Sequence, residues 1–120
     1  MSVYIWGSNK CKQVPGEKNL HRYAPGLLHD GLENQMPIQV AAGDGHTVIL
    51  CESGDVYTFG RGTEGQLGRN GNISIKGHSN RVAGLDNDTI VRVAAGSMTT
   101  YAVTLSGDVY QWYDDISLII

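Results

Sequence analysis

The stretch Asp55–Gly68, DVYTFGRGTEGQLG, decides the fold because other parts of the chain repeat it. Its first letters recur as SVYIWG from Ser2 and as DVYQW from Asp108, so the spacing is 53 residues both times. Shifting the whole chain by 53 residues needs no gap and gives 18 identities in 58 positions. The chain therefore contains two copies of one unit, at 2–54 and 55–107, and 108–120 begins a third.

Each unit has the period-2 pattern of β-strands. The aromatic residues of VYIWG, VYTFG and VYQW alternate with smaller residues, so they share one face of each strand. IQVAAG and VRVAAG, which end at Gly43 and Gly96, predict a second strand, and HTVILC and TYAVTL predict a third. Gly54 and Gly107 supply the positive φ of the tight hairpins that follow.

A short strand around 81–85, RVAGL, would give each unit four strands. Antiparallel strands in groups of four at this spacing are typical of propeller blades. The expected fold is therefore all-β, a partial β-propeller with two four-stranded antiparallel blades plus the first strand of a third.

Gly60, Gly62 and Gly65 match the G-x-G-x-x-G spacing of dinucleotide-binding loops. Such a loop needs a helix after it, because the phosphate lies at the helix N-terminus. The residues that follow are QLGRNGN, whose glycines and asparagines break helices. We expect these glycines to turn a corner of the chain, and we expect no cofactor.

The order VYxWG, GQLG, VxxVAAG, GxxHT and SGDVY resembles the regulator-of-chromosome-condensation repeat over residues 2–112. In that family several repeats close into a propeller ring, and its members include an exchange factor for a nuclear small GTPase and interaction domains of ubiquitin ligases and kinases. The resemblance implies structural roles for the motif residues Gly43, His46, Gly54, Gly60, Gly65, Gln66, Leu67, Gly68, Gly96 and Gly107.

Two stretches depart from the family pattern. The first loop reads SNKCKQVPG, in which only Gln13 and the apolar Val14 match Gln66 and Leu67. After Trp112 the chain reads YDDISLII, where the family would continue with Gly and another GQLG. We therefore expect a fragment of a longer propeller, or a chain that self-associates through open blade edges.

His46 next to Asp44 in GDGHT invites a metal or acid–base interpretation, but no further ligands lie at a suitable spacing. We expect His46 to pack or to form hydrogen bonds, and we predict no metal and no catalytic residue. Cys11 and Cys51 form no redox motif, so free thiols in a cytoplasmic or nuclear compartment are expected.

The formal net charge of −3 gives no general reason to expect nucleic acid or membrane partners. Residues 1–22 carry +3, since four cations stand against Glu17, which favours a solvated loop over a basic patch. There is no signal-peptide pattern, and ISLII is too short to span a bilayer.

We predict a protein–protein interaction scaffold that binds through loops, because the loops differ most between the copies, as at 10–22 against 63–75. The alternative is a guanine-nucleotide exchange factor or regulator of a small GTPase, which the resemblance alone implies. The chain is not expected to be an enzyme.

Overall fold

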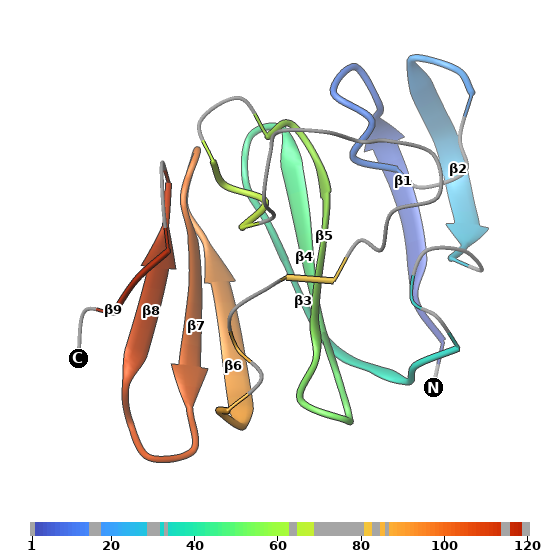
Figure 1. Ribbon diagram of the computed structural model, residues 1–120. Helices are drawn as coiled ribbons and strands as arrows, with labels where there is room; N and C mark the ends of the chain where they lie inside the picture. The colour runs from blue at the N-terminus through green and yellow to red at the C-terminus, as the bar shows by residue number, and fades with distance from the viewer. Residues whose placement is uncertain are drawn as a thin grey trace.

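Nine strands and no helix make up the described part of the chain, which the computed structural model places as three antiparallel sheets side by side (Figure 1). The structure describes residues 2–14, 18–28, 32, 34–62, 65–68, 81–82, 85, 87–113 and 116–118. The strands are β1 (Tyr4–Ser8), β2 (His21–Leu27), β3 (Pro37–Ala42), β4 (His46–Cys51), β5 (Val56–Gly60), β6 (Ile90–Ala95), β7 (Thr100–Thr104), β8 (Val109–Trp112) and β9 (Ile116–Leu118).

The first sheet pairs β1 with β2, the second has the order β3-β4-β5, and the third has the order β6-β7-β8-β9. The repeat is visible in the register, because Thr47 faces Phe59 in the second sheet as Thr100 faces Trp112 in the third. This arrangement confirms the all-β, propeller-type fold class.

The expected hairpins after β4 and β7 are present at equivalent positions. The amide of Cys51 donates to the carbonyl of Asp55, and the amide of Thr104 donates to the carbonyl of Asp108, both at 2.9 Å. Gly54 and Gly107 have φ values of +91° and +97°, which only glycine adopts without strain. The SGD sequence thus determines where each strand reverses.

Sheet boundaries and sequence-unit boundaries are offset. The unit 2–54 contains β1 to β4, but β3 and β4 form their sheet with β5 of the next unit. In the same way β8, at the start of the third unit, is the third strand of the sheet that begins with β6. Each of these sheets therefore takes strands from two successive units.

Two strands lie where the sequence pattern predicted none. β2 contains Pro25 and Gly26, residues that are tolerated in a strand whose other edge is open. β9 lies in the tail after Trp112 and pairs with β8, so Trp112 faces Ile116. The strand expected at 81–85 is represented in the described residues by a bridge between Arg81 and Tyr57.

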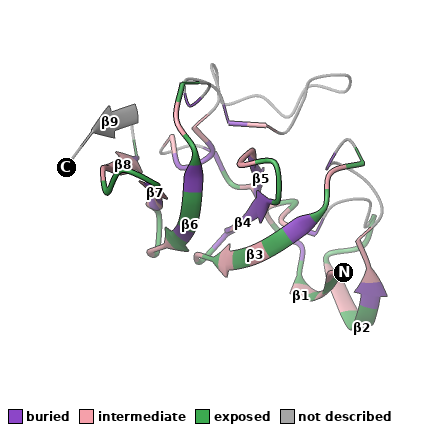
Figure 2. Ribbon diagram, turned by 90° about the horizontal axis from the view of Figure 1, so that it is seen from below, coloured by how far each residue is buried: buried purple, intermediate pink, exposed green. Residues whose placement is uncertain are grey.

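Buried residues predominate along β4 and β5 of the second sheet (Figure 2), and the apolar residues described there belong to two core clusters, one on each face of the sheet. The core towards the third sheet includes Val48, Leu50, Val56, Val82, Leu85, Ile90, Val93, Ala102 and Trp112. The core on the opposite face consists of Leu32, Ile49, Cys51, Tyr57 and Phe59. Alternate residues of β4 point to opposite cores, as the period of a strand requires.

One side-chain amide also joins the second and third sheets. Gln39 donates from Nε2 to the carbonyl of Val93 at 3.0 Å, and its Oε1 accepts from the Val93 amide at 2.9 Å. The Gln39 side chain thus forms with Val93 of β6 the same pair of hydrogen bonds that the backbone of a neighbouring strand would form.

Candidate interaction site

The loop that carries GQLG is held against the third sheet by a threonine. Thr100 donates its hydroxyl proton to the carbonyl of Gln66 at 2.7 Å, and both residues are buried. Its copy 53 residues earlier, Thr47, donates to the carbonyl of Gln13 at 3.1 Å. The threonine of the GxxHT motif therefore binds the preceding loop in both copies, and the identity of this residue between the copies is the sequence signal.

His46 joins the same junction. Its Nε2 lies 3.0 Å from Oγ1 of Thr100. The single hydroxyl proton of Thr100 is directed to Gln66, so Nε2 carries a proton and donates it to Thr100, which leaves Nδ1 as an unprotonated nitrogen. Within the described residues this Nδ1 is buried and has no hydrogen-bond partner.

Burial lowers the pKa of His46, because a charged imidazolium would lose its hydration. The backbone of Thr99 and the carboxylate of Asp44 oppose this effect. His46 is thus a buried histidine whose ring contacts a residue of the next sheet.

The other motif residues of the loop are also packed inside. Leu67 is 4% exposed, and its carbonyl accepts a hydrogen bond from the hydroxyl of Thr58 at 2.7 Å. Gly68 has φ +61°, and a Cβ at this position would lie 2.6 Å from Nε1 of Trp112. This close approach explains a glycine at the end of GQLG.

The remaining motif glycines lie at chain reversals. Gly43 follows β3 and contacts the ring of His46, whereas Gly96 occupies the same place after β6. Gly60 ends β5 against the backbone of Gly45, and Gly65 forms a turn to Gly62. The described residues 65–68 form a turn.

The connections at the ends of β1, β3, β5 and β6 lie at one end of the three sheets, and we call residues 9–14, 43–45, 61–62, 65–68 and 96–99 the loop rim (Figure 1). The amide of Asp44 donates to the carbonyl of Ser97 at 3.0 Å, and Ser97 Oγ donates to the Asp44 carboxylate at 2.6 Å. The amide of Arg61 donates to the carbonyl of Gly45 at 2.8 Å. The loops of the second and third sheets thus form one continuous surface.

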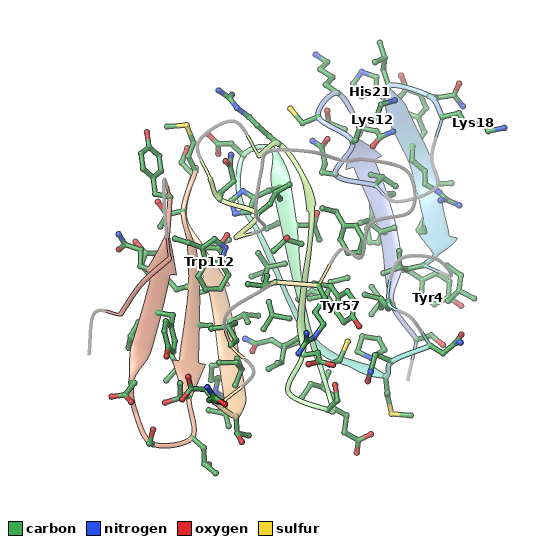
Figure 3. All side chains as sticks on the ribbon, in the orientation of Figure 1. Tyr4, Lys12, Lys18, His21, Tyr57 and Trp112 are labelled. Atoms are coloured by element: carbon green, nitrogen blue, oxygen red, sulfur yellow. The ribbon has the colours of Figure 1, made fainter. Side chains whose placement is uncertain are left out.

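A small hollow of about 100 Å³ opens on the loop rim, lined by Cys11, Asp44, Gly45, Arg61, Gln66, Ser97 and Met98. Lys10 and Lys12 lie exposed on the same rim, and Figure 3 shows Lys12 and His21 at this end of the first sheet. The loop rim thus carries charged groups of both signs, including Lys10, Lys12 and Asp44.

A larger cavity of about 400 Å³ lies between β1 and the second sheet. Its lining is largely apolar and includes Ile5, Trp6, Val40 and Ile49. Tyr4 and Trp6 are 59% and 57% exposed, although their copies Tyr57 and Phe59 are 0% and 4% exposed. The aromatic side chains of β1 are thus much more exposed than their copies in β5.

Neither cysteine forms a disulfide. Cys51 is fully buried, and this burial raises the pKa of its thiol to about 11, whereas Cys11 is half-buried on the loop rim. Across the described ranges, no group of three or more His, Cys, Asp or Glu side chains is placed to hold a metal ion. The same ranges contain no helix that is long and apolar enough to cross a bilayer.

Comparison with known families identifies the repeat. Two family models, both described as the regulator of chromosome condensation (RCC1) repeat, match residues 38–66 and 53–103. This chain belongs to the RCC1-repeat family. The matched ranges contain His46, the hairpin at Gly54 and the described residues of the GQLG loop.

Relatives with RCC1 repeats are much longer than this chain. The probable E3 ubiquitin-protein ligase HERC4 of Mus musculus is 35% identical over 112 residues, which is 92% of this chain and 10% of HERC4. The protein RCC2 homolog of Danio rerio is 33% identical over 110 residues, which is 92% of this chain and 22% of that protein. The match with HERC4 covers only its repeat region, so the match gives no basis for assigning ligase activity to this chain.

Among solved structures, Prp20p of Saccharomyces cerevisiae, studied for its binding to Gsp1p and histones, superimposes with a TM-score of 0.79. The match is 21% identical and covers 99% of this chain and 34% of Prp20p. At this identity the likeness establishes the RCC1 propeller fold, of which this chain forms a part.

Proposed function

We propose that this RCC1-repeat chain is a protein–protein interaction module that binds its partner through the loop rim. The observation that carries the proposal is the continuity of the rim, because hydrogen bonds between Asp44 and Ser97 hold loops of two sheets in one surface. Loops fixed on a rigid scaffold lose little conformational entropy when they bind. The proposal includes no catalytic step and no cofactor.

The chemistry of the rim indicates a partner with a polar, partly acidic surface. Lys10 and Lys12 are exposed on it, and the Arg61 side chain lines its hollow. Exposed cations of this kind accelerate association with an acidic partner, and they add specificity more than affinity. We also propose an intracellular location, cytoplasmic or nuclear, which the two free cysteines support.

The test is affinity capture of partner proteins with the immobilised chain and with two charge variants. The double substitution Lys10→Glu and Lys12→Glu reverses charge on the rim, whereas Glu52→Lys changes an exposed residue of a hairpin at the opposite end. We expect the rim variant to lose the captured proteins and the control to keep them. Equal capture by both variants would place the binding surface elsewhere.

A second candidate function is guanine-nucleotide exchange or another regulation of a small GTPase. The observation in its favour is the fold shared with Prp20p, a protein studied for its binding to Gsp1p. The experiment measures release of a fluorescent nucleotide from a nuclear small GTPase in the presence of this chain. Acceleration would favour exchange activity, and binding without acceleration would favour the interaction module.

A further inference from the structure

The turn after the first strand of each unit has the same backbone in both copies but different residues. In the first copy, the amide of Lys12 donates to the carbonyl of Asn9 at 3.1 Å. In the second copy, 53 residues later, the amide of Gly65 donates to the carbonyl of Gly62 at 3.1 Å. The values of φ are +65° at Lys12 and +78° at Gly65. Both copies therefore adopt the left-handed conformation at this position, one with lysine and the other with glycine.

Lysine is an unfavourable residue for this conformation. Glycine adopts positive φ without steric penalty, whereas the Cβ of other residues crowds the backbone. Among the described residues, Asn34 is the other non-glycine residue with positive φ, and asparagine tolerates it better than lysine. The turn itself thus gives no reason for Lys12, and a strained backbone in a loop points to a role beyond the fold.

The first copy of this loop carries three lysines that the second copy lacks. Lys10, Lys12 and Lys18 are all exposed. The residues at the places of Lys10 and Lys18 in the second unit are threonine and glycine. Figure 3 shows Lys12 and Lys18 at the same end of the first sheet. The sequence alone favoured a solvated loop for these cations, but it could not show the backbone conformation of Lys12.

A buried asparagine holds the loop in one conformation. Asn9 is 0% exposed, and its Oδ1 accepts from the amide of Val14 at 3.0 Å. Its Nδ2 donates to the carbonyl of Asn19 at 2.9 Å, and its amide donates to the carbonyl of Leu20 at 2.7 Å. We call the described residues 9–14 and 18–20 the lysine loop. Because Asn9 joins its two segments, the loop is ordered before it binds, which lowers the entropic cost of binding.

We propose that the lysine loop docks a short acidic segment of a protein partner, and that Lys12 determines this specificity. The inference rests on the function proposed for the loop rim, of which residues 9–14 are a part. Ammonium groups complement the carboxylates of such a segment. The formal net charge of −3 opposes binding to a long nucleic acid or an anionic membrane, which would face much of the molecule at once. A short segment meets the three cations alone.

The experiment measures binding of the whole chain to a short fluorescein-labelled peptide of aspartate and glutamate residues by fluorescence anisotropy. The control peptide has asparagine and glutamine in their places. The wild-type chain should bind the acidic peptide, more tightly at low salt, and should not bind the control. Lys12→Gly and Lys12→Gln should each weaken binding by about two- to fivefold, which is the usual effect of one exposed charge pair.

Stability measurements separate binding from folding. Glycine relieves the backbone strain, so Lys12→Gly should unfold at no lower urea concentration than the wild type although it binds the peptide less tightly. Asn34→Gly changes the other residue with positive φ, in a turn before β3, and should leave peptide affinity unchanged. A Lys12→Gly variant with wild-type affinity would overturn the proposal. So would a folded wild-type chain that does not bind the acidic peptide.

Competition tests the class of partner. Single-stranded oligo(dT) and phosphatidylserine vesicles should displace the acidic peptide poorly, because the rest of the chain is anionic. Tighter binding of either competitor than of the peptide would overturn the choice of a protein segment.

Capture of partner proteins separates this inference from the function proposed for the whole loop rim. Asp44→Lys alters the rim outside the lysine loop, where Asp44 bonds to Ser97. Captured proteins that are lost with Asp44→Lys but kept by Lys12→Gly would support the loop rim and contradict the lysine loop. Loss of the captured proteins with Lys12→Gly, and their recovery in Lys12→Arg, is the result expected here.

Discussion

Nε2 of His46, in the second sheet, lies 3.0 Å from the hydroxyl of Thr100, in the third. The two residues belong to the same GxxHT segment in successive copies of the repeat, since Thr100 follows the position that corresponds to His46. One copy of the motif therefore binds the next copy, and the carbonyl of Gln66 completes the contact. This junction makes the stability of neighbouring sheets interdependent.

Replacement of Thr100 by valine should destabilise the chain. The change leaves the buried carbonyl of Gln66 without its donor and Nε2 of His46 without its acceptor. We expect a loss of about 1–3 kcal/mol in the free energy of unfolding, measured by urea denaturation. Thr100→Ser, which keeps the hydroxyl, is the matched control and should lose less. Equal stability of the valine variant and the wild type would contradict the role assigned to this junction.

Stability should fall as the pH falls below the ordinary pKa of histidine. The pKa of His46 is lowered in the folded state, so between the folded and unfolded values the unfolded chain binds more protons. The contribution of His46 is fully present above about pH 6.5 and is lost as the pH decreases towards the lowered value. Urea denaturation at several pH values measures this slope.

The matched variant for the pH experiment is His46→Gln, whose amide can still donate to Thr100 but does not titrate. We expect it to be less stable near neutral pH, because its shape differs, and to lose stability less steeply as the pH falls below about 6.5. An unchanged slope would assign the pH dependence to other groups.

Replacing Gly68 by alanine should lower the free energy of unfolding more than replacing Gly107 by alanine. Both glycines have positive φ, so each substitution carries a backbone penalty of about 1–2 kcal/mol. At Gly107 the new methyl group meets open space, whereas at Gly68 it would lie 2.6 Å from the indole nitrogen of Trp112. Thermal unfolding gives the two stabilities, and a shift in Trp112 fluorescence should accompany Gly68→Ala alone. Equal losses would show that the loop yields to the added methyl group.

The two thiols should react at very different rates. Cys51 is fully buried and its pKa is raised to about 11, so little thiolate forms at neutral pH and reagents cannot reach it. Cys11 is half-buried on the loop rim. A chromogenic disulfide reagent should titrate one thiol in the native chain and two in urea. In Cys11→Ser the native reaction should disappear, and rapid labelling of this variant would instead show that the second sheet opens.

Periodicity in the sequence was sufficient to predict the long, repeated strands. The pairs Tyr4/Tyr57 and Gly7/Gly60 are identical at the 53-residue shift, and both copies lie in strands. β2 was missed because Pro25 and Gly26 are poor strand formers, and its pairing with β1 depends on tertiary context. β9 was missed because three residues of a divergent tail have no periodicity to detect.

The sequence alone led to the expectation that His46 packs or forms hydrogen bonds, but it did not identify the residues that His46 contacts. His46 was expected to form a hydrogen bond, but Thr100 as its acceptor follows only from the packing of adjacent sheets. Likewise, Tyr4 and Tyr57 are indistinguishable in the repeat, although one is exposed and the other is buried. Local pattern determines the strand, whereas position within the row of sheets determines its surroundings.

The offset between sequence units and sheets has a consequence for how such chains are divided or extended. A cut between Gly54 and Asp55 follows the sequence repeat, yet it separates β4 from β5 within one hydrogen-bonded sheet. A cut near Thr89, just before β6, leaves the second and third sheets whole. Insertions, fusion points and split-protein fragments should therefore be tolerated better between sheets than between sequence repeats, because a cut between sheets leaves the hydrogen-bonded strands of each sheet together.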